Sequence, residues 1–376
     1  MARDINHRLS SLKARRSGSD RLDSLTYDQM TKAFEAAAAT DIYEKRSGQK
    51  HTQYALGAMQ EVGPDYTRVS VTTAERVGNQ LESGLDGFSI NVEFRLQGSV
   101  PANIHIRGYS DVDLLVLRLD FLTYATAGAQ ALRGGYTSPS PPRTSTEVLQ
   151  ELRTASTKIL KAQFPAADVD TSGGKAVKIS GGSLARAVDV VPSHWFDTLA
   201  YQSSWSEVDR GVTIYDRKIA WTLDNYPFKH IELLGQRDTA TSGGLKKAIR
   251  LCKNVKCDAD SDIGLSSFEI ASLLYHADQQ ALRQGSVYEL AVLAEAQRYL
   301  DYLYKNPSAA SALRVPDGSR LILDSERKRS ALISLSLELD TLARDVSKEQ
   351  SLAMVLYPDA GFDQVSRVLR EAYIPV

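Results

Sequence analysis

The sequence predicts an α+β protein in which a lobe built on a mixed sheet is followed by a lobe of helices. The strand pattern lies in the first part, where "FSINVEFRLQGS" alternates apolar and polar residues and "DVDLLVL" is a mainly apolar run. Beyond about Pro227 this pattern fades, and "VYELAVLAEAQRYLDYLY" and "SERKRSALISLSLELDTLARDV" show helical spacing instead. We therefore expect a first lobe over residues 1–227 and a helical lobe over residues 228–376.

Composition narrows the class of protein. The chain has 376 residues, of which 43% are hydrophobic, enough to bury one large core or two ordinary ones. Lys plus Arg (45) nearly balance Asp plus Glu (46), so we expect no long nucleic acid as partner. The only cysteines, Cys252 and Cys257, lack a cluster of further ligands, which fits a reducing cytoplasm better than a zinc or disulfide framework. Neither a membrane-spanning run nor an export segment is visible, so we expect a cytoplasmic protein with no membrane partner.

The first lobe begins with helical patterns from Tyr27 to about Gly84, and they are followed by a strand with Ile90, Val92, Phe94 and Leu96 on one side. A Gly/Ser/Pro loop ends at Thr144, which forms a capping-box pattern with Glu147. The next helix has a predicted buried stripe of Val148, Leu152, Ala155 and Ile159. Two further strands follow in "AVKIS" and "LARAVDVVPSHW".

Two carboxylates interrupt the apolar run "DVDLLV". Residues two apart in a strand point to the same face, so Asp111 and Asp113 would lie together while Val112, Leu114 and Val116 enter the core. Neighbouring anions repel, and a divalent cation such as Mg²⁺, which prefers oxygen ligands, would compensate them. The alternative is an exposed strand end with two solvated aspartates.

Two further features accompany this pair. Gly98 and Ser99 end the preceding strand, with eleven residues between Ser99 and Asp111, and a glycine lets backbone amides approach phosphate oxygens closely. Asp189 lies in another strand-like run, "RAVDVV". Three aspartates on adjacent strands could hold two Mg²⁺ ions about 3.5–4 Å apart, the arrangement that serves nucleotidyl transfer. His194, five residues after Asp189, could approach a substrate, although a hydrogen-bonded structural role is the expected one.

Basic residues recur in two helices. In the helix predicted from Gly244 to Cys257, Lys246, Arg250 and Lys253 share a stripe, which indicates either an anionic partner or a solvated basic face. Near the N-terminus a second cluster, made of Arg8, Lys13, Arg15 and Arg16, indicates a solvated helix or a local RNA or lipid contact.

A third helix begins with a capping box from Ser266 to Glu269, which places Ser267 and Phe268 in its first turn. Free backbone amides at such a helix start favour phosphate. Phe268 projects away from the helix's own apolar stripe, so we expect it either to stack on a base or to pack against another element.

These motifs resemble a known superfamily. "QGS", eleven residues, "DVDLLV" and a later strand Asp are similar to the signature of polymerase-β-like nucleotidyltransferases. "TSGGLKKAIRLCKNVK" and "GLSSFEIASLLYH" resemble the helical motifs of one branch, the CD-NTases, which are bacterial cyclic-oligonucleotide synthases of anti-phage (CBASS) defence and relatives of animal cyclic GMP-AMP synthase and oligoadenylate synthase. The resemblance spans residues 85–280.

The resemblance implies a two-lobed fold with a long N-terminal helix and an active site in the cleft between the lobes. It implies that ATP and a second NTP such as GTP are joined into a cyclic di- or trinucleotide, a second messenger that acts on a separate effector. Asp111, Asp113 and Asp189 would be catalytic and hold two Mg²⁺ ions, for which Mn²⁺ can substitute. Gly98, Ser99, Lys253 and Ser267 would bind phosphates, and Phe268 would stack on a base.

The sequence departs from the family in three places. Many relatives have Tyr at Phe268, and the zinc-binding insertion of the animal enzyme has no counterpart. The ending "AYIPV" lacks the Gly or Ala through which some members are joined to partners, so we do not expect such conjugation. Two other functions share these motifs: a nucleotidyltransferase that modifies tRNA or a protein, as a toxin does, and a nucleotide-binding module without turnover.

Overall fold

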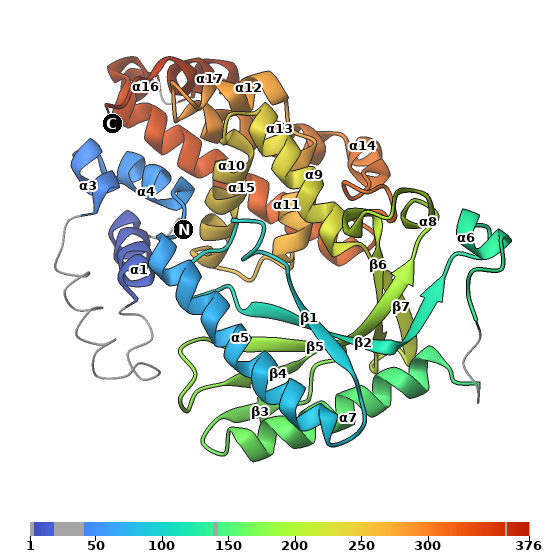
Figure 1. Ribbon diagram of the computed structural model, residues 1–376. Coiled ribbons are helices and arrows are strands. Elements are labelled where there is room, and N and C mark those ends of the chain that lie inside the picture. The colour runs from blue at the N-terminus through green and yellow to red at the C-terminus, as the bar shows by residue number, and fades with distance from the viewer. Residues whose placement is uncertain (1–3, 19–40, 138–141, 358, 376) are drawn as a thin grey trace. The chain divides into compact units, whose positions relative to one another are not determined.

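The computed structural model describes residues 4–18, 41–137, 142–357 and 359–375 (Figure 1). Much of the helical pattern expected between Tyr27 and Lys45 lies outside these residues. The chain forms two compact units. The sheet unit comprises residues 63–102 and 110–232, and the helical unit comprises residues up to 62, residues 103–109 and residues from 233 onward.

This division differs from the expected boundary after residue 227. The third and last segment of the helical unit begins at Leu233, inside helix α9 (Pro227–Ala240), close to that boundary. The N-terminal helices, however, pack with the helical unit and not with the sheet. Residues 103–109 also pack there, although they connect two strands of the sheet unit. Sequence order alone does not show such contacts between distant segments.

The sheet unit contains a mixed sheet of seven strands within the described residues. The strands are β1 (Val92–Gln97), β2 (Val112–Tyr124), β3 (Asp168–Asp170), β4 (Val177–Ser180), β5 (Val188–Asp197), β6 (Gly211–Asp216) and β7 (Trp221–Asn225). Their order is β1-β2-β5-β4-β3, and β6 pairs with the later part of β5 and with β7. Only the β2 and β5 pair is parallel, so these two central strands run side by side in the same direction.

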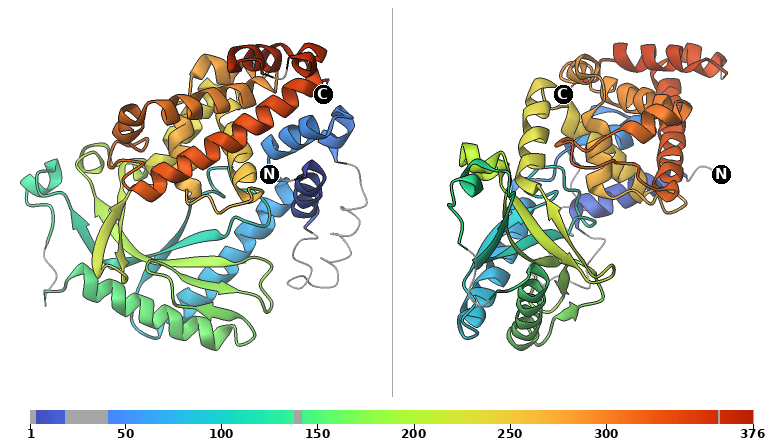
Figure 2. Two further views of the ribbon diagram at one scale, coloured as in Figure 1. Left: turned by 180° about the vertical axis from the view of Figure 1, so that it is seen from behind. Right: turned by 90° about the vertical axis from the view of Figure 1, so that its right-hand side faces the viewer.

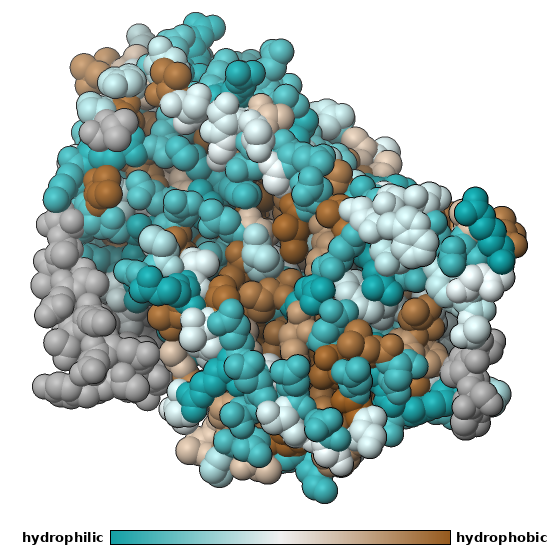
Figure 3. Space-filling view, in the orientation of Figure 1, coloured by the Kyte–Doolittle hydropathy of each residue, from teal (hydrophilic) through white to brown (hydrophobic). Residues whose placement is uncertain are grey.

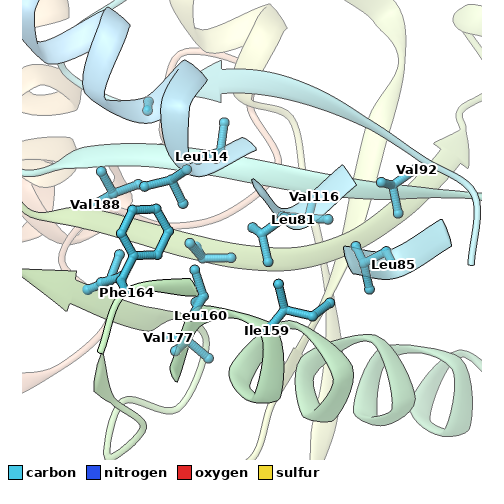
Figure 4. Packing of buried hydrophobic residues seen from close by; sticks show 14 of the residues in the cluster. Leu81, Leu85, Val92, Leu114, Val116, Ile159, Leu160, Phe164, Val177 and Val188 are labelled. Atoms are coloured by element: carbon cyan, nitrogen blue, oxygen red, sulfur yellow. The ribbon is translucent and has the colours of Figure 1, made fainter. Parts of the chain in front are cut away.

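Two helices, α5 (Pro64–Asp86) and α7 (Ser145–Gln163), lie side by side on one face of this sheet (Figures 1 and 2). Their apolar stripes and the inward residues of the strands form one buried cluster, which Figure 4 shows from close by. The predicted stripe of α7 is confirmed, and so is its capping box from Thr144 to Glu147. Val112, Leu114 and Val116 enter this cluster as expected. Short helices α6 (Ala129–Leu132) and α8 (Tyr201–Ser204) complete the unit.

The opposite sheet face carries a smaller apolar cluster that includes Leu115, Leu117 and Val191. These residues alternate with those of the large cluster along β2 and β5. Asp113 and Asp189 belong to this second face, because they lie two positions before Leu115 and Val191. Both acids therefore lie on the face that α5 and α7 leave uncovered.

The helical unit is built around α10 (Gly244–Cys257), whose predicted bounds are confirmed. The other helices are α1 (Ile5–Ser17), α3 (Ile42–Arg46), α4 (Lys50–Met59), α11 (Ser267–Tyr275), α12 (Gln279–Gln284), α13 (Ala291–Lys305), α14 (Pro307–Ala312), α15 (Glu326–Gln350), α16 (Leu352–Leu356) and α17 (Phe362–Glu371). In the described part of the chain, no helix has the length and apolar character needed to cross a membrane. Hydrophilic residues cover much of the surface in Figure 3, with smaller hydrophobic areas between them.

Candidate active site

Asp113 and Asp189 are direct neighbours in the sheet. Asp113 lies at the second position of β2 and Asp189 at the second position of β5, and the register pairs their Cα atoms. Paired residues of parallel strands point to the same face, so the two carboxylates lie beside each other. Asp111 immediately precedes β2, two residues before Asp113. Strand register therefore brings Asp113 beside Asp189, and Asp111 lies two residues before Asp113 in the chain.

The pairing continues across the sheet as a row of polar residues. Gln97 of β1 is opposite Asp113, and Lys178 of β4 is opposite Asp189. Asp170 of β3 is in turn opposite Lys178. Because opposed residues share a face, all five side chains belong to one surface of the sheet. Sequence analysis did not single out Lys178 or Asp170, since "AVKIS" reads as an ordinary strand with one polar residue.

Lys178 provides a positive charge within this acidic cluster. Its ammonium group donates to a carboxylate oxygen of Asp111 and forms an ion pair with it. Burial raises the pKa of Asp189, and the negative charge of Asp111 raises it further, whereas Lys178 acts in the opposite direction. The cluster therefore disfavours the charged form of Asp189, and an additional cation would stabilise that charged form.

Gly98 lies in the turn that follows β1 and has a positive φ of 76°. A Cβ atom at this position would lie 2.2 Å from Oδ2 of Asp113. Glycine is therefore required both by the backbone conformation and by the close approach of Asp113. Ser99 follows in the same turn, half-buried. The Gly-Ser pair thus lies next to the carboxylates, as its position in the sequence predicts.

The donor atoms fit a divalent cation, because three carboxylates on one face are the ligands that Mg²⁺ prefers. Among the described residues, however, no three acidic, histidine or cysteine side chains are already close enough together to hold a metal ion. The carboxylates would have to converge on an ion, and Asp111 would have to leave Lys178.

In the helical unit, Lys253 and Ser267 line one cavity of about 340 Å³. Ser267 is the first residue of α11, and the capping box from Ser266 to Glu269 that places it there is confirmed. Tyr109 and Lys256 line the same cavity but were not predicted from the sequence. Tyr109 is 57% exposed, and an exposed tyrosine two residues before Asp111 is the signal that could have identified it.

Two residues of the basic stripe of α10, Arg250 and Lys253, are buried and so do not form a solvated face. Each of them also lines a cavity. Arg250 donates to the backbone carbonyls of Met59 and Asn103, at 2.8 and 2.9 Å. Lys253 donates to the carbonyl of Ile104 at 2.7 Å. The stripe therefore holds the segment 103–109, which links Ser99 to Asp111, and Lys253 still reaches the wall of the cavity.

Phe268 and His194 complete the predicted positions. Phe268 is half-buried, and the guanidinium carbon of Arg320 lies 4.8 Å from the centre of its ring. A cation over the face of an aromatic ring is attracted to it. His194 is fully buried, with Nδ1 at 2.9 Å from the Trp195 carbonyl oxygen and Nε2 at 3.0 Å from the Ser145 hydroxyl. The structural role expected for His194 is confirmed.

Comparison with known proteins identifies the family. No protein-family model matches the chain. The cyclic dinucleotide synthase CdnE of Yersinia aleksiciae is 41% identical over 357 residues, which cover 91% of this chain and 92% of that protein. A c-di-GMP synthase of Capnocytophaga granulosa is 31% identical over 287 residues, covering 72% and 80%. The solved structure of the STING-associated CdnE c-di-GMP synthase from Capnocytophaga granulosa has a TM-score of 0.67 at 26% identity and covers 90% of this chain and 97% of that one.

Such relatives, together with paired aspartates on parallel strands, make the chain a nucleotidyltransferase. More narrowly, the chain belongs to the CD-NTase family, the bacterial cyclic-oligonucleotide synthases of CBASS defence. The resemblance found in the sequence and the α+β, polymerase-β-like fold class are both confirmed.

Proposed function

We propose that this protein joins ATP and a second NTP into a cyclic dinucleotide at the carboxylates of the sheet unit. The alignment of Asp113 with Asp189, with Asp111 two residues away, is the observation that carries the proposal. Asp111, Asp113 and Asp189 would hold two Mg²⁺ ions, for which Mn²⁺ can substitute. When bound, such ions neutralise the charge that develops on the reacting phosphate and lower the pKa of the attacking hydroxyl.

The remaining residues bind and orient the nucleotides. The amides and the hydroxyl of Gly98 and Ser99 suit phosphate oxygens, because the turn presents backbone N–H groups beside the carboxylates. In the helical unit, Lys253 and Ser267 contribute a cation and a helix N-terminus to the cavity of about 340 Å³. Phe268 would stack on a base, which stabilises binding without selecting its identity.

The chemical step transfers one nucleotidyl group at a time. A ribose hydroxyl oxygen of one nucleotide attacks the α-phosphorus of another, and the bond from that phosphorus to the pyrophosphate oxygen breaks. The hydroxyl proton passes to a carboxylate or to water, and Asp189 would help to accept it. A second transfer within the linear dinucleotide closes the ring and releases the second pyrophosphate.

The product would act in the cytoplasm as a second messenger on a separate effector protein. The Yersinia relative supports a cyclic dinucleotide as the product, and two relatives at 31–32% identity are named c-di-GMP synthases. GTP is therefore included beside ATP among the substrates to be tested. None of the residues assigned above distinguishes these bases by itself, so the test uses all four NTPs.

The test incubates the purified protein with labelled ATP, GTP, CTP or UTP, singly and in pairs, with Mg²⁺, and then with phosphatase. We expect a phosphatase-resistant product that is absent in Asp111→Asn/Asp113→Asn and present in Asp65→Asn, a control that removes an exposed carboxylate 82% accessible at the start of α5. A label that appears instead on tRNA or protein in a cell lysate would contradict the proposal and support the modifying enzyme.

A further inference from the structure

Lys178 occupies a central place in the polar row that contains the catalytic acids. On one side it lies opposite Asp189, on the other it lies opposite Asp170, and its ammonium group is bound to Asp111. Strand pairing on both edges of β4 fixes its backbone, so its side chain is held on the same face as the acids. Lys178 thus places a positive charge inside the acidic cluster.

The ammonium group also competes with a metal ion for the same oxygen atoms. It forms an ion pair with a carboxylate that would bind the ion, and its own charge repels any cation that enters. The Lys178 side chain is 42% exposed and that of Asp111 is 25% exposed, so the pair is accessible to solvent and can separate without breaking a buried contact.

We propose that Lys178 is a positioning residue that holds Asp111 while the site lacks a divalent cation and releases it when the cation arrives with the nucleotide. The proposal rests on the proposed function, in which Asp111, Asp113 and Asp189 hold the ions. Lys178 keeps the three acids together without an ion, and it makes ion binding weak until another anion is present to favour it.

Asp170 gives the released ammonium group a second partner. It lies directly across from Lys178 on β3, is exposed, and has a pKa lowered mainly by hydrogen bonds from the Ser172 amide and hydroxyl. A turn of the lysine side chain away from Asp111 brings its charge toward this carboxylate or toward a nucleotide phosphate. No change of protonation is needed, because the ammonium group only exchanges one anionic partner for another.

Nucleotide and ion binding are coupled as a result. A triphosphate supplies oxygen ligands to the ion and an alternative anion for Lys178, so it removes the competition at Asp111. Without nucleotide, the ion must displace Lys178 unaided. The expected consequence is that nucleotide raises ion affinity more in the wild-type protein than in a protein without this lysine.

The experiment measures Mn²⁺ binding to the full-length protein by electron paramagnetic resonance, with and without a nonhydrolysable ATP analogue. Without nucleotide, Lys178→Met should bind Mn²⁺ tighter than the wild type by about fivefold or more, the lower end of typical coupling between two ligands. The gain in affinity on adding nucleotide should be smaller in Lys178→Met, while Lys178→Arg, which keeps the charge, should behave as the wild type. Lys175→Met, which removes an exposed lysine in the segment before β4, should also leave Mn²⁺ binding unchanged.

Two results overturn the inference, and they are distinguishable. If Lys178→Met binds Mn²⁺ no tighter than Lys175→Met, the lysine does not compete with the ion, although the proposed function stands. If Asp111→Asn/Asp113→Asn binds Mn²⁺ as well as the wild type, the carboxylates do not hold the ion, and the proposed function fails together with the inference. Near-ultraviolet circular dichroism of each variant verifies that it is folded.

Discussion

Gly98 and Asp113 approach so closely that no side chain fits between them: a Cβ atom on Gly98 would lie 2.2 Å from Oδ2 of Asp113. Gly98 begins the turn after β1, and Asp113 is the second residue of β2, two residues after Asp111. Gly98 thus positions the Asp113 carboxylate, and in the proposed function its turn also presents backbone amides to phosphate. These two roles act at the same place, because β1 and β2 are paired up to Gln97 and Asp113.

Gly98→Ala is predicted to reduce synthesis by at least about 100-fold, because the new methyl group displaces a carboxylate that stabilises the transition state. The positive φ adds a backbone strain of roughly 1 kcal/mol. Gly181→Ala is the matched control, since Gly181 has a φ of 74° and no atom within 4 Å of its added Cβ. Gly181→Ala should lose about as much stability through this backbone strain as Gly98→Ala does, and it should retain its activity. Product formation and thermal unfolding of both variants check this, and an inactive Gly181→Ala would contradict it.

Asp189→Asn is predicted to lose activity while it gains stability. Burial and the charge of Asp111 raise the pKa of Asp189, so the folded state disfavours its charged form at neutral pH. Asparagine has nearly the same shape without that charge. We expect a loss of about 100-fold or more in synthesis, with a melting temperature equal to or above that of the wild type. A lower melting temperature would show that the carboxylate stabilises the fold.

Most of the fold could be predicted because its elements have strong local signals. The capping boxes at Thr144 and Ser266 fix two helix starts, and both are present. The alternation in β1 and the apolar run of β2 identify the strands and the face that enters the core. The carboxylates were predictable for the same reason, since a charged residue in a buried strand has no packing role there.

The partners of the basic residues could not be predicted. Arg250 and Lys253 bind backbone carbonyls, and a carbonyl has no sequence signature. In α1, Arg8 and Arg15 are buried in ion pairs with Glu338 and Asp258, hundreds of residues away along the chain, so neither a solvated helix nor an RNA or lipid contact describes them. A charge pattern in the sequence indicates that a basic residue needs an anionic or polar partner. Which partner it binds depends on segments that only the fold brings together.

Glu269 provides a prediction with a defined dependence on pH. Burial alone would raise its pKa, but hydrogen bonds from Lys328 and from the Ser266 amide and hydroxyl outweigh burial and lower it. A carboxyl group whose pKa is lower in the folded than in the unfolded state stabilises the fold at pH values above its unfolded pKa. This contribution to stability is lost as the pH falls through the folded pKa. Glu269→Gln should therefore be less stable than the wild type by about 0.5–2 kcal/mol at pH 7.

Urea unfolding at several pH values measures this difference. It should shrink below about pH 4.5, where the unfolded carboxyl begins to bind protons, and disappear in stronger acid. Glu326→Gln is a matched control, because Glu326 is 80% exposed in the first turn of α15 and pairs with Arg329 at the surface. A difference for Glu269→Gln that is constant down to strong acid would contradict the assignment.

The buried ion pair of Arg15 and Asp258 is predicted to be the most sensitive site in the helical unit. Both terminal guanidinium nitrogens of Arg15 donate to Asp258, at 2.7 and 2.6 Å, and the Tyr54 hydroxyl donates to the same carboxylate at 2.7 Å. All three side chains are nearly inaccessible to solvent. Asp258→Asn leaves the arginine charge buried without its counter-charge, which costs about 3–5 kcal/mol.

Urea unfolding of single and double variants checks this prediction. Arg15→Met/Asp258→Asn should be more stable than Asp258→Asn, because removing the second charge relieves the penalty left by the first. Lys13→Met is the control on the same helix: its pair with Glu44, at 3.1 Å, has a lysine that is 41% exposed, so the loss should stay within about 1 kcal/mol. If the double variant is as unstable as the sum of the two single ones, the two side chains act independently and the buried pair is not the cause.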